Sequence, residues 1–176
     1  SGTRPAAVNA AGIATINALA PGRTFLGVGS GNTARRIMGM PPQKIAEFDA
    51  YLETLVPLMR GEEAWLKHGD RDIPIRHIMP EDGFVNFKDP IPLFVSGFGP
   101  RSLALAGTYG DGAVLGVSTQ SAVRQSLAAV HEGARASSRA LAPGGSEANF
   151  YNTALTCITV LDPQEPVDSP RVKREC

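Results

Sequence analysis

The sequence predicts an α/β fold in which about four central parallel strands are covered by helices. Short apolar runs bounded by glycines alternate along the chain with longer segments of helical periodicity. Two of these short runs end in glycine-rich loops that lead directly into predicted helices. The strand–helix units differ in length, which argues against a short-period repeat protein. We expect one domain over residues 1–176, with an excursion at about 62–89.

The first strand is predicted at Thr24–Val28, a short apolar run between a turn and a glycine-rich loop. A helix is predicted before it, from Pro5 to about Leu19, and a short helix after it, at Thr33–Met38. Helical spacing puts four residues of the first helix on one face: Val8, Gly12, Ile16 and Leu19.

The clearest helix is predicted over Gln43–Arg60. Its apolar residues recur at spacings of three and four: Ile45, Phe48, Leu52, Leu55 and Met59. Gly61 is expected to cap the carboxyl end, and Pro57 to kink the last turn. Residues 65–89 lack a clean period, and we interpret them as an excursion with a small hairpin between Ile73–His77 and Phe84–Phe87. An irregular segment of this length also suggests a lid over a site.

The second half of the chain continues the alternation. Strands are predicted at Pro92–Ser96, Gly112–Val117 and Thr153–Leu161, and helices at Pro100–Tyr109 and Thr119–Leu141. Cys157 lies in an apolar run and is interpreted as a buried structural thiol. Together with Cys176 it makes neither a disulfide framework nor a metal cluster.

Composition is that of a soluble globular protein. Apolar residues make up 43% and charged residues 19%, and Lys plus Arg balances Asp plus Glu at 17 each. This neutral balance favours neither nucleic acid nor an anionic membrane as a partner. The sequence has no apolar run of membrane-spanning length and no signal-peptide pattern at residues 1–5, so a cytoplasmic location is expected.

The loop after the first strand is one candidate site, with Gly29, Ser30 and Asn32 as its candidate ligand contacts. Glycines let backbone amides approach a ligand closely, and a helix that follows favours an anion. Residues 29–34 also match the dinucleotide fingerprint G-x-G-x-x-A. The acidic residues at about the required distance, Asp49 and Glu53, fall inside the predicted helix of 43–60.

The loop after the second strand is the other candidate site. Its candidate contacts are Gly97, Phe98, Gly99 and Ser102. A helix begins at once after the glycines, so free amides and the Ser102 hydroxyl are placed to cradle a phosphate. The alternative is that the glycines only permit a tight turn. Because parallel strands carry their following loops to one rim, we expect the two candidate sites to meet there.

Catalytic side chains are not evident. His68, His77 and His131 are scattered, and the sequence contains neither HExxH, nor paired cysteines, nor a G-x-S-x-G elbow. The difficult chemistry is therefore expected to fall to a cofactor.

Three stretches together resemble the bacterial luciferase-like superfamily. Residues 20–32 (APGRTFLGVGSGN) are similar to its fourth-strand segment, and residues 90–100 (PIPLFVSGFGP) to its fifth strand and phosphate loop. Residues 104–114 (ALAGTYGDGAV) are similar to the helix and sixth strand that follow. In order and spacing the likeness covers nearly the whole chain. It is closest to the branch of deazaflavin-dependent methylene-tetrahydromethanopterin reductase-like proteins, which the tail at 162–172 also resembles.

The resemblance implies part of a (β/α)₈ TIM barrel that uses FMN or coenzyme F420 on a small organic substrate, as a monooxygenase or a hydride-transfer reductase. It implies phosphate contacts at Phe98, Gly99 and Ser102. Gly29, Ser30 and Asn32 match the loop beside the cofactor. In luciferases an Arg stands at the place of Ser30, which leaves the choice between FMN and F420 open. The family's first three strands, which carry most proposed catalytic residues, have no counterpart here.

Two other functions stay open. One is a Rossmann-type enzyme that binds NAD or S-adenosylmethionine through the first loop alone, and the other is a non-catalytic flavin-binding protein. A first helix without a strand before it and a last strand without a helix after it are expected of a fragment of a barrel. Since half a barrel leaves strand edges open, we expect self-association, and a homo-oligomer at full length.

Overall fold

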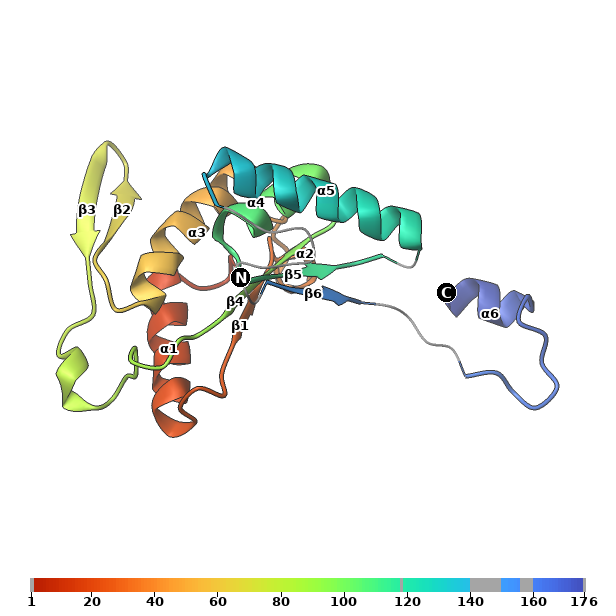
Figure 1. Ribbon diagram of the computed structural model, residues 1–176, viewed down its shortest axis with the longest axis horizontal. Helices are drawn as coiled ribbons and strands as arrows, with labels where there is room; N and C mark the ends of the chain where they lie inside the picture. Colours follow the sequence, from red (N-terminus) through yellow and green to blue (C-terminus); the bar gives the residue numbers. More distant parts are fainter. Residues whose placement is uncertain (1, 118, 140–149, 156–159, 176) are drawn as a thin grey trace.

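The computed structural model describes residues 2–117, 119–139, 150–155 and 160–175. Four parallel strands form one sheet in the order β1–β4–β5–β6 (Figure 1). Their bounds are β1 Leu26–Val28, β4 Leu93–Gly97, β5 Gly112–Leu115 and β6 Tyr151–Ala154. The predicted α/β fold with about four parallel strands is confirmed.

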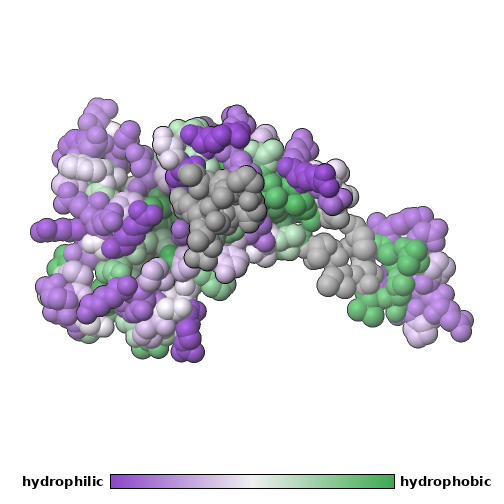
Figure 2. All heavy atoms as spheres, in the orientation of Figure 1, coloured by the Kyte–Doolittle hydropathy of each residue, from purple (hydrophilic) through white to green (hydrophobic). Residues whose placement is uncertain are grey.

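Four longer helices accompany the sheet: α1 Ala6–Leu19, α3 Ile45–Met59, α4 Pro100–Tyr109 and α5 Gln120–Ala136. Short helical segments are α2 Asn32–Arg36, η1 Pro80–Asp82 and α6 Pro170–Glu175. Helix α1 packs on α3, α3 on α4, and α4 on α5. In Figure 1, α3, α4 and α5 lie on one side of the sheet. Figure 2 shows hydrophilic residues over the hairpin and over the outer turns of these helices. No helix in the described ranges has the length and apolar content needed to cross a bilayer.

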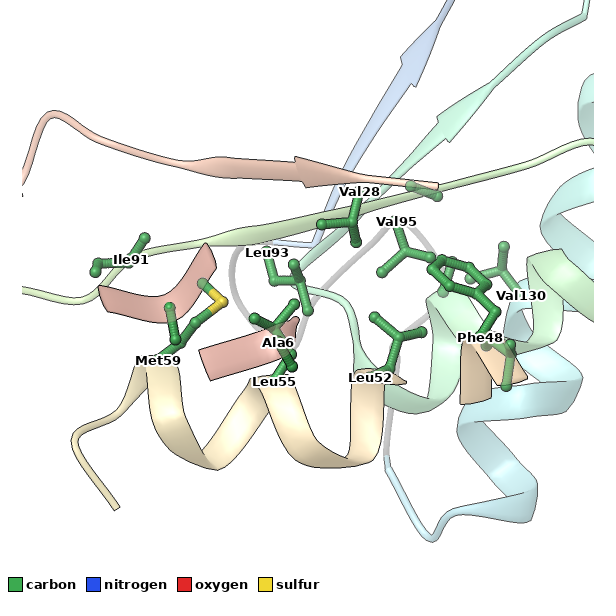
Figure 3. Close-up of a cluster of buried hydrophobic side chains, with 14 of the residues drawn as sticks. Ala6, Val28, Phe48, Leu52, Leu55, Met59, Ile91, Leu93, Val95 and Val130 are labelled. Carbon is green, nitrogen blue, oxygen red and sulfur yellow. The ribbon is translucent and has the colours of Figure 1, made fainter. Parts of the chain in front are cut away.

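The core lies between the sheet and this helix layer. Val28, Leu93 and Val95 point from β1 and β4 toward α3, where Leu52 and Leu55 meet them (Figure 3). All five side chains are buried, and each contributes about 1.5–3 kcal/mol by leaving water. Strand residues alternate between two faces, so the neighbouring positions point to the other side of the sheet.

Helix α1 is present, but its buried face differs from the predicted stripe. Val8 and Ile16 are each 52% exposed and Leu19 is 82% exposed. The residues that α1 buries are Ala6, Ala10, Ala14 and Asn17. The small side chains of these three alanines allow the axes of α1 and α3 to lie close together. The buried face of α1 is therefore the one with the smallest side chains and not the one with the most hydrophobic side chains.

The carboxyl end of α3 follows the prediction. Gly61 has a left-handed backbone (φ +75°), and its N–H donates to the Leu58 carbonyl. The N–H of Glu62 donates to the Pro57 carbonyl at 3.0 Å, which completes a Schellman cap. Gly61 thus caps the helix as expected. Pro57 lies inside the last turn, and the predicted kink stays a prediction.

The excursion contains a hairpin, but its strands are not the predicted ones. Strand β2 (Ala64–His68) pairs antiparallel with β3 (Arg71–Ile75). The two-residue connection, Gly69-Asp70, has a left-handed glycine (φ +62°) and is a known hairpin signal. Residues 84–87 form no strand. The hairpin follows the end of α3 where Met59 packs beside the start of β4 (Figure 3), so it does not lie over the glycine-rich loops as a lid.

Two boundaries near the carboxyl end also differ. Strand β6 begins two residues before the predicted Thr153, and its described pairing with β5 runs from Tyr151 to Ala154. Residues 156–159 of the predicted strand lie outside the described residues. Helix α5 ends at Ala136 rather than near 141. Cys157 and Cys176 lie outside the described residues.

Helices α4 and α5 cross in close contact through glycines. A Cβ added to Gly107 would lie 1.9 Å from the Val130 carbonyl oxygen, and one added to Gly133 would lie 1.9 Å from the Ala104 carbonyl oxygen. Neither oxygen can move without breaking a helix. The absence of side chains at these two positions therefore determines how closely the helices pack.

We predict that Gly107→Ala lowers the free energy of unfolding by about 1–3 kcal/mol, because the new methyl group overpacks the crossing. Gly12→Ala is the matched control on α1, where an added Cβ meets nothing within 4 Å. The control should raise stability by about 0.5–1 kcal/mol through helix propensity. Urea unfolding followed by circular dichroism measures both, and equal effects of the two substitutions would contradict the close crossing.

Candidate functional site

Both predicted loops line one cavity of about 310 Å³ at the carboxyl ends of β1 and β4. All seven predicted site residues border it: Gly29, Ser30, Asn32, Gly97, Phe98, Gly99 and Ser102. Five further wall residues were not among the predicted contacts: Gly31, Thr33, Pro42, Ile45 and Ser96. Ser96 carried a usable signal, since it directly precedes the second glycine loop.

Adjacent parallel strands bring the two loops together. Leu26 pairs with Leu93 and Val28 with Val95, so the residues that follow each strand emerge side by side. A Cβ built on Gly29 would lie 3.5 Å from the Ser96 Cβ, an ordinary contact distance. The expectation that the loops meet at one rim is confirmed.

The first loop is braced from α2. Asn32 Oδ1 accepts a hydrogen bond from Arg36 Nε at 2.7 Å. Arg35 donates to the Pro41 and Gly2 carbonyl oxygens, each at 2.6 Å. Gly31 holds a left-handed backbone (φ +79°) immediately before α2. Arg35 and Arg36 of α2 thus hold the first loop in its conformation through these hydrogen bonds.

The second loop is closed by the start of α4. The Ser102 hydroxyl donates to the Gly99 carbonyl at 2.9 Å, and the Gly99 N–H donates back to Ser102 Oγ at 3.2 Å. In this conformation the hydroxyl and that amide bind each other. The first-turn amides of Arg101 and Ser102 are the ones that a helix leaves without helical acceptors.

Glycine occupies positions 97 and 99 of this loop for different physical reasons. A Cβ on Gly97 would lie 2.7 Å from Ser102 Oγ and 2.9 Å from the Leu103 nitrogen, so packing against α4 requires glycine there. A Cβ on Gly99 would meet nothing within 4 Å, and its φ of −105° suits any residue. The alternative that the glycines only permit a tight turn therefore explains Gly97 but not Gly99. Gly99 leaves open space on the cavity wall, as a ligand that approaches the backbone needs.

Phe98 lies at the mouth of the cavity. Its side chain is 75% exposed, and its ring sits over Gly116, where a Cβ would be 2.1 Å from Phe98 Cε1. Gly116 follows β5 directly, so the ring extends from the end of one strand across the end of the next. Gly116 is a further residue of this rim that was not among the predicted contacts.

The described residues that line the cavity include no acidic, basic or histidine side chain. An anion there would be stabilised by backbone dipoles and hydroxyl groups rather than by an ion pair. The described ranges also contain no group of three His, Cys, Asp or Glu side chains placed to hold a metal. Backbone groups and hydroxyl and amide side chains are therefore the polar groups that the described lining of this cavity offers.

A larger cavity of about 820 Å³ lies at the amino ends of the strands, away from the predicted site. Its walls include Phe25, Phe94 and Tyr151, which belong to the sheet face opposite the helices. Size does not make it the better candidate, because ligands of parallel α/β folds bind at the carboxyl ends of strands.

Comparison with known proteins agrees with this geometry. The family model described as luciferase-like monooxygenase matches residues 2–165. An F420-dependent glucose-6-phosphate dehydrogenase from Beutenbergia cavernae is 33% identical over 145 residues, which are 77% of this chain and 41% of that protein. The chain thus spans about 41% of the length of this curated relative.

Solved structures share the fold. An F420-dependent secondary alcohol dehydrogenase, in complex with an F420–acetone adduct, superposes with a TM-score of 0.65 at 21% identity. The match covers 85% of this chain and 44% of that one. The oxygenating constituent of 3,6-diketocamphane monooxygenase from Pseudomonas putida, in complex with FMN, gives a TM-score of 0.57 at 18% identity. It covers 77% of this chain and 41% of that one.

These neighbours are TIM-barrel enzymes, so the expected partial (β/α)₈ barrel is confirmed at the level of the fold. The family match includes all four strands of the sheet and both glycine-rich loops. The chain belongs to the luciferase-like monooxygenase family.

Proposed function

We propose that this chain forms the phosphate-binding part of an oxidoreductase that uses FMN or coenzyme F420 to act on a small organic molecule. The observation that carries the proposal is the single cavity shared by the two glycine-rich loops. The relatives add support, since their names include both F420-dependent and FMN-containing enzymes.

The cavity fits the anionic tail of such a cofactor. Gly99 leaves room for a phosphate against the backbone, and the first turn of α4 directs amides toward it. No described acidic side chain lines the cavity to repel the charge. At about 310 Å³ the cavity is at the small end for ligand sites, so we assign it the tail and leave the ring to the neighbouring rim.

The cofactor, when bound, supplies hydride transfer or oxygen chemistry at its ring. Phe98, Gly99 and Ser102 hold the phosphate, while Ser30 and Asn32 contact the adjoining chain of the cofactor. Holding the tail restricts the position of the ring relative to a substrate. Since no described titratable side chain lines the cavity, we assign proton transfer to groups outside it.

The Rossmann-type alternative has less support. Asp49, which stands near the distance of the fingerprint's acidic residue, lies on α3 and accepts a hydrogen bond from the Tyr109 hydroxyl at 2.7 Å. Burial is the main factor that raises the pKa of Tyr109, with Asp49 adding to it. Asp49 therefore ties α3 to α4 and does not line the glycine cavity. One observation favours the alternative of a non-catalytic flavin-binding protein: no described titratable side chain lines the cavity.

We also propose that the enzyme works in the cytoplasm without a nucleic-acid partner, in keeping with its balanced charge, and that it self-associates.

We predict that Gly99→Asp weakens binding of FMN or F420 about tenfold or more, on the order of 1.4 kcal/mol, because a carboxylate enters the anion cradle. The neutral Gly99→Asn is the matched control of equal size and should bind more tightly than the Asp variant. Fluorescence titration measures both affinities. Equal affinity of Gly99→Asp and the unsubstituted protein would remove Gly99 from the phosphate site.

Titration with FMN, F420, NAD and S-adenosylmethionine distinguishes the proposed oxidoreductase from the two alternative functions. We expect FMN or F420 to bind and NAD and S-adenosylmethionine not to bind, since only the former suit a cradle built from both loops. Isothermal calorimetry measures the four affinities, and absorption of the retained cofactor distinguishes a flavin from a deazaflavin. Binding of NAD that survives Gly99→Asp would favour the Rossmann-type reading. Flavin binding without turnover in the presence of reductant and oxygen would favour the non-catalytic one.

A further inference from the structure

We propose that Arg36 and Arg101 bind the part of the cofactor tail that extends beyond the phosphate, and that they favour a tail that carries carboxylates. Such a tail belongs to F420, whose phosphate is a diester that continues into a chain of glutamates, whereas FMN ends at its phosphate. The inference rests on the proposed function, because it requires the phosphate to lie in the cavity between the two glycine-rich loops.

The first observation is an uneven distribution of charge. The chain has 17 acidic residues, yet none of them falls in residues 1–46 or 90–110. These two stretches contain every described residue that lines the cavity. Their basic residues are Arg4, Arg23, Arg35, Arg36, Lys44 and Arg101. A chain that is neutral overall is therefore basic in the segments that build the cavity, which favours an anionic ligand there.

The second observation is the position of Arg36. Its Nε donates to Asn32 Oδ1 at 2.7 Å, and Asn32 lines the cavity. The Nη groups of this exposed residue have no acceptor among the described residues. Arg35 differs, because its guanidinium already donates to the Pro41 and Gly2 carbonyl oxygens. Arg36 is thus fixed beside the cavity with N–H donors left for a carboxylate.

The third observation is Arg101 on the opposite wall. It stands in the first turn of α4, in the chain between Gly99 and Ser102, which both line the cavity. Arg101 is exposed, and its guanidinium has no partner in the described ranges. Each glycine-rich loop is therefore followed by a short way of chain that carries one exposed arginine with available donors.

Both arginines fit the tail rather than the phosphate itself. Neither belongs to the described lining of the cavity, which has no charged side chain. A ligand held in a cavity of about 310 Å³ extends beyond it, and its extension meets the surrounding surface. Glu47, the first acidic residue after residues 1–46, accepts a hydrogen bond from the Lys44 backbone N–H at 3.1 Å and so caps α3.

The test compares three cofactors: F420 with its glutamates, F420 shortened to the lactyl phosphate, and FMN. We expect Arg36→Gln and Arg101→Gln each to weaken binding of glutamate-bearing F420 about two- to fivefold, as for an exposed ion pair. The effect should be smaller for the shortened form and smallest for FMN, which has no carboxylate. Fluorescence titration of the purified chain at low salt measures the affinities. At about 1 M salt the differences should disappear, because charges are then screened within about 3 Å.

Two control variants separate the tail contact from other effects. Arg36→Lys keeps the positive charge but loses the Nε hydrogen bond to Asn32, so it should retain most of the preference for glutamate-bearing F420. Arg71→Gln makes the same substitution at an exposed position of the hairpin and should change none of the affinities. Circular dichroism checks that each variant folds.

The outcomes distinguish this inference from the proposed function. If the cofactors bind and neither Arg36→Gln nor Arg101→Gln changes any affinity, the inference is overturned and the phosphate site stands. Equal weakening of all three cofactors also overturns it, because the arginines would then act on the phosphate or on the loops. So does an unsubstituted chain that binds glutamate-bearing F420 no more tightly than the shortened form. If none of the three cofactors binds, the proposed function fails and this inference fails with it.

Discussion

Parallel pairing of β1 with β4 is the constraint on which the candidate site depends. The strands are separated by more than sixty positions in the chain, yet their register places Val28 beside Val95. Because both strands run the same way, both glycine-rich loops leave the sheet at the same edge. Leu52 and Leu55 of α3 pack beneath the two strands and hold this register (Figure 3). Without that alignment, the two loops would be unrelated turns.

The glycines of this fold have several structural roles, which the space around each one and its backbone angles distinguish. Gly107 and Gly133 let two helices cross, and Gly97 lets α4 start directly against the end of β4. Gly61 provides the left-handed cap of α3. Gly99 meets none of these needs. A glycine without a structural requirement on a cavity wall is the best local indication that a ligand approaches the backbone there.

The two faces of the sheet differ in how far the described helices cover them. Helices α3, α4 and α5 cover one face (Figure 1). On the other face the side chains of Phe25 and Tyr151 are exposed. The chain matches less than half of the length of the relatives compared with it.

The sequence by itself determined the fold class, the order of the four sheet strands and the longer helices, and seven of the residues that line the candidate cavity. Those features depend on local patterns: period-two and helical spacing, glycines after apolar runs, and a helix start after each loop. It did not determine that Ala10 and Ala14, rather than Ile16 and Leu19, face the core, because the choice depends on how closely α3 approaches. The start of β6 at Tyr151 likewise depended on a partner across the sheet, Gly112 of β5. Tertiary structure alone also decided which glycines are needed for packing, since atoms distant in sequence set the space around each of them.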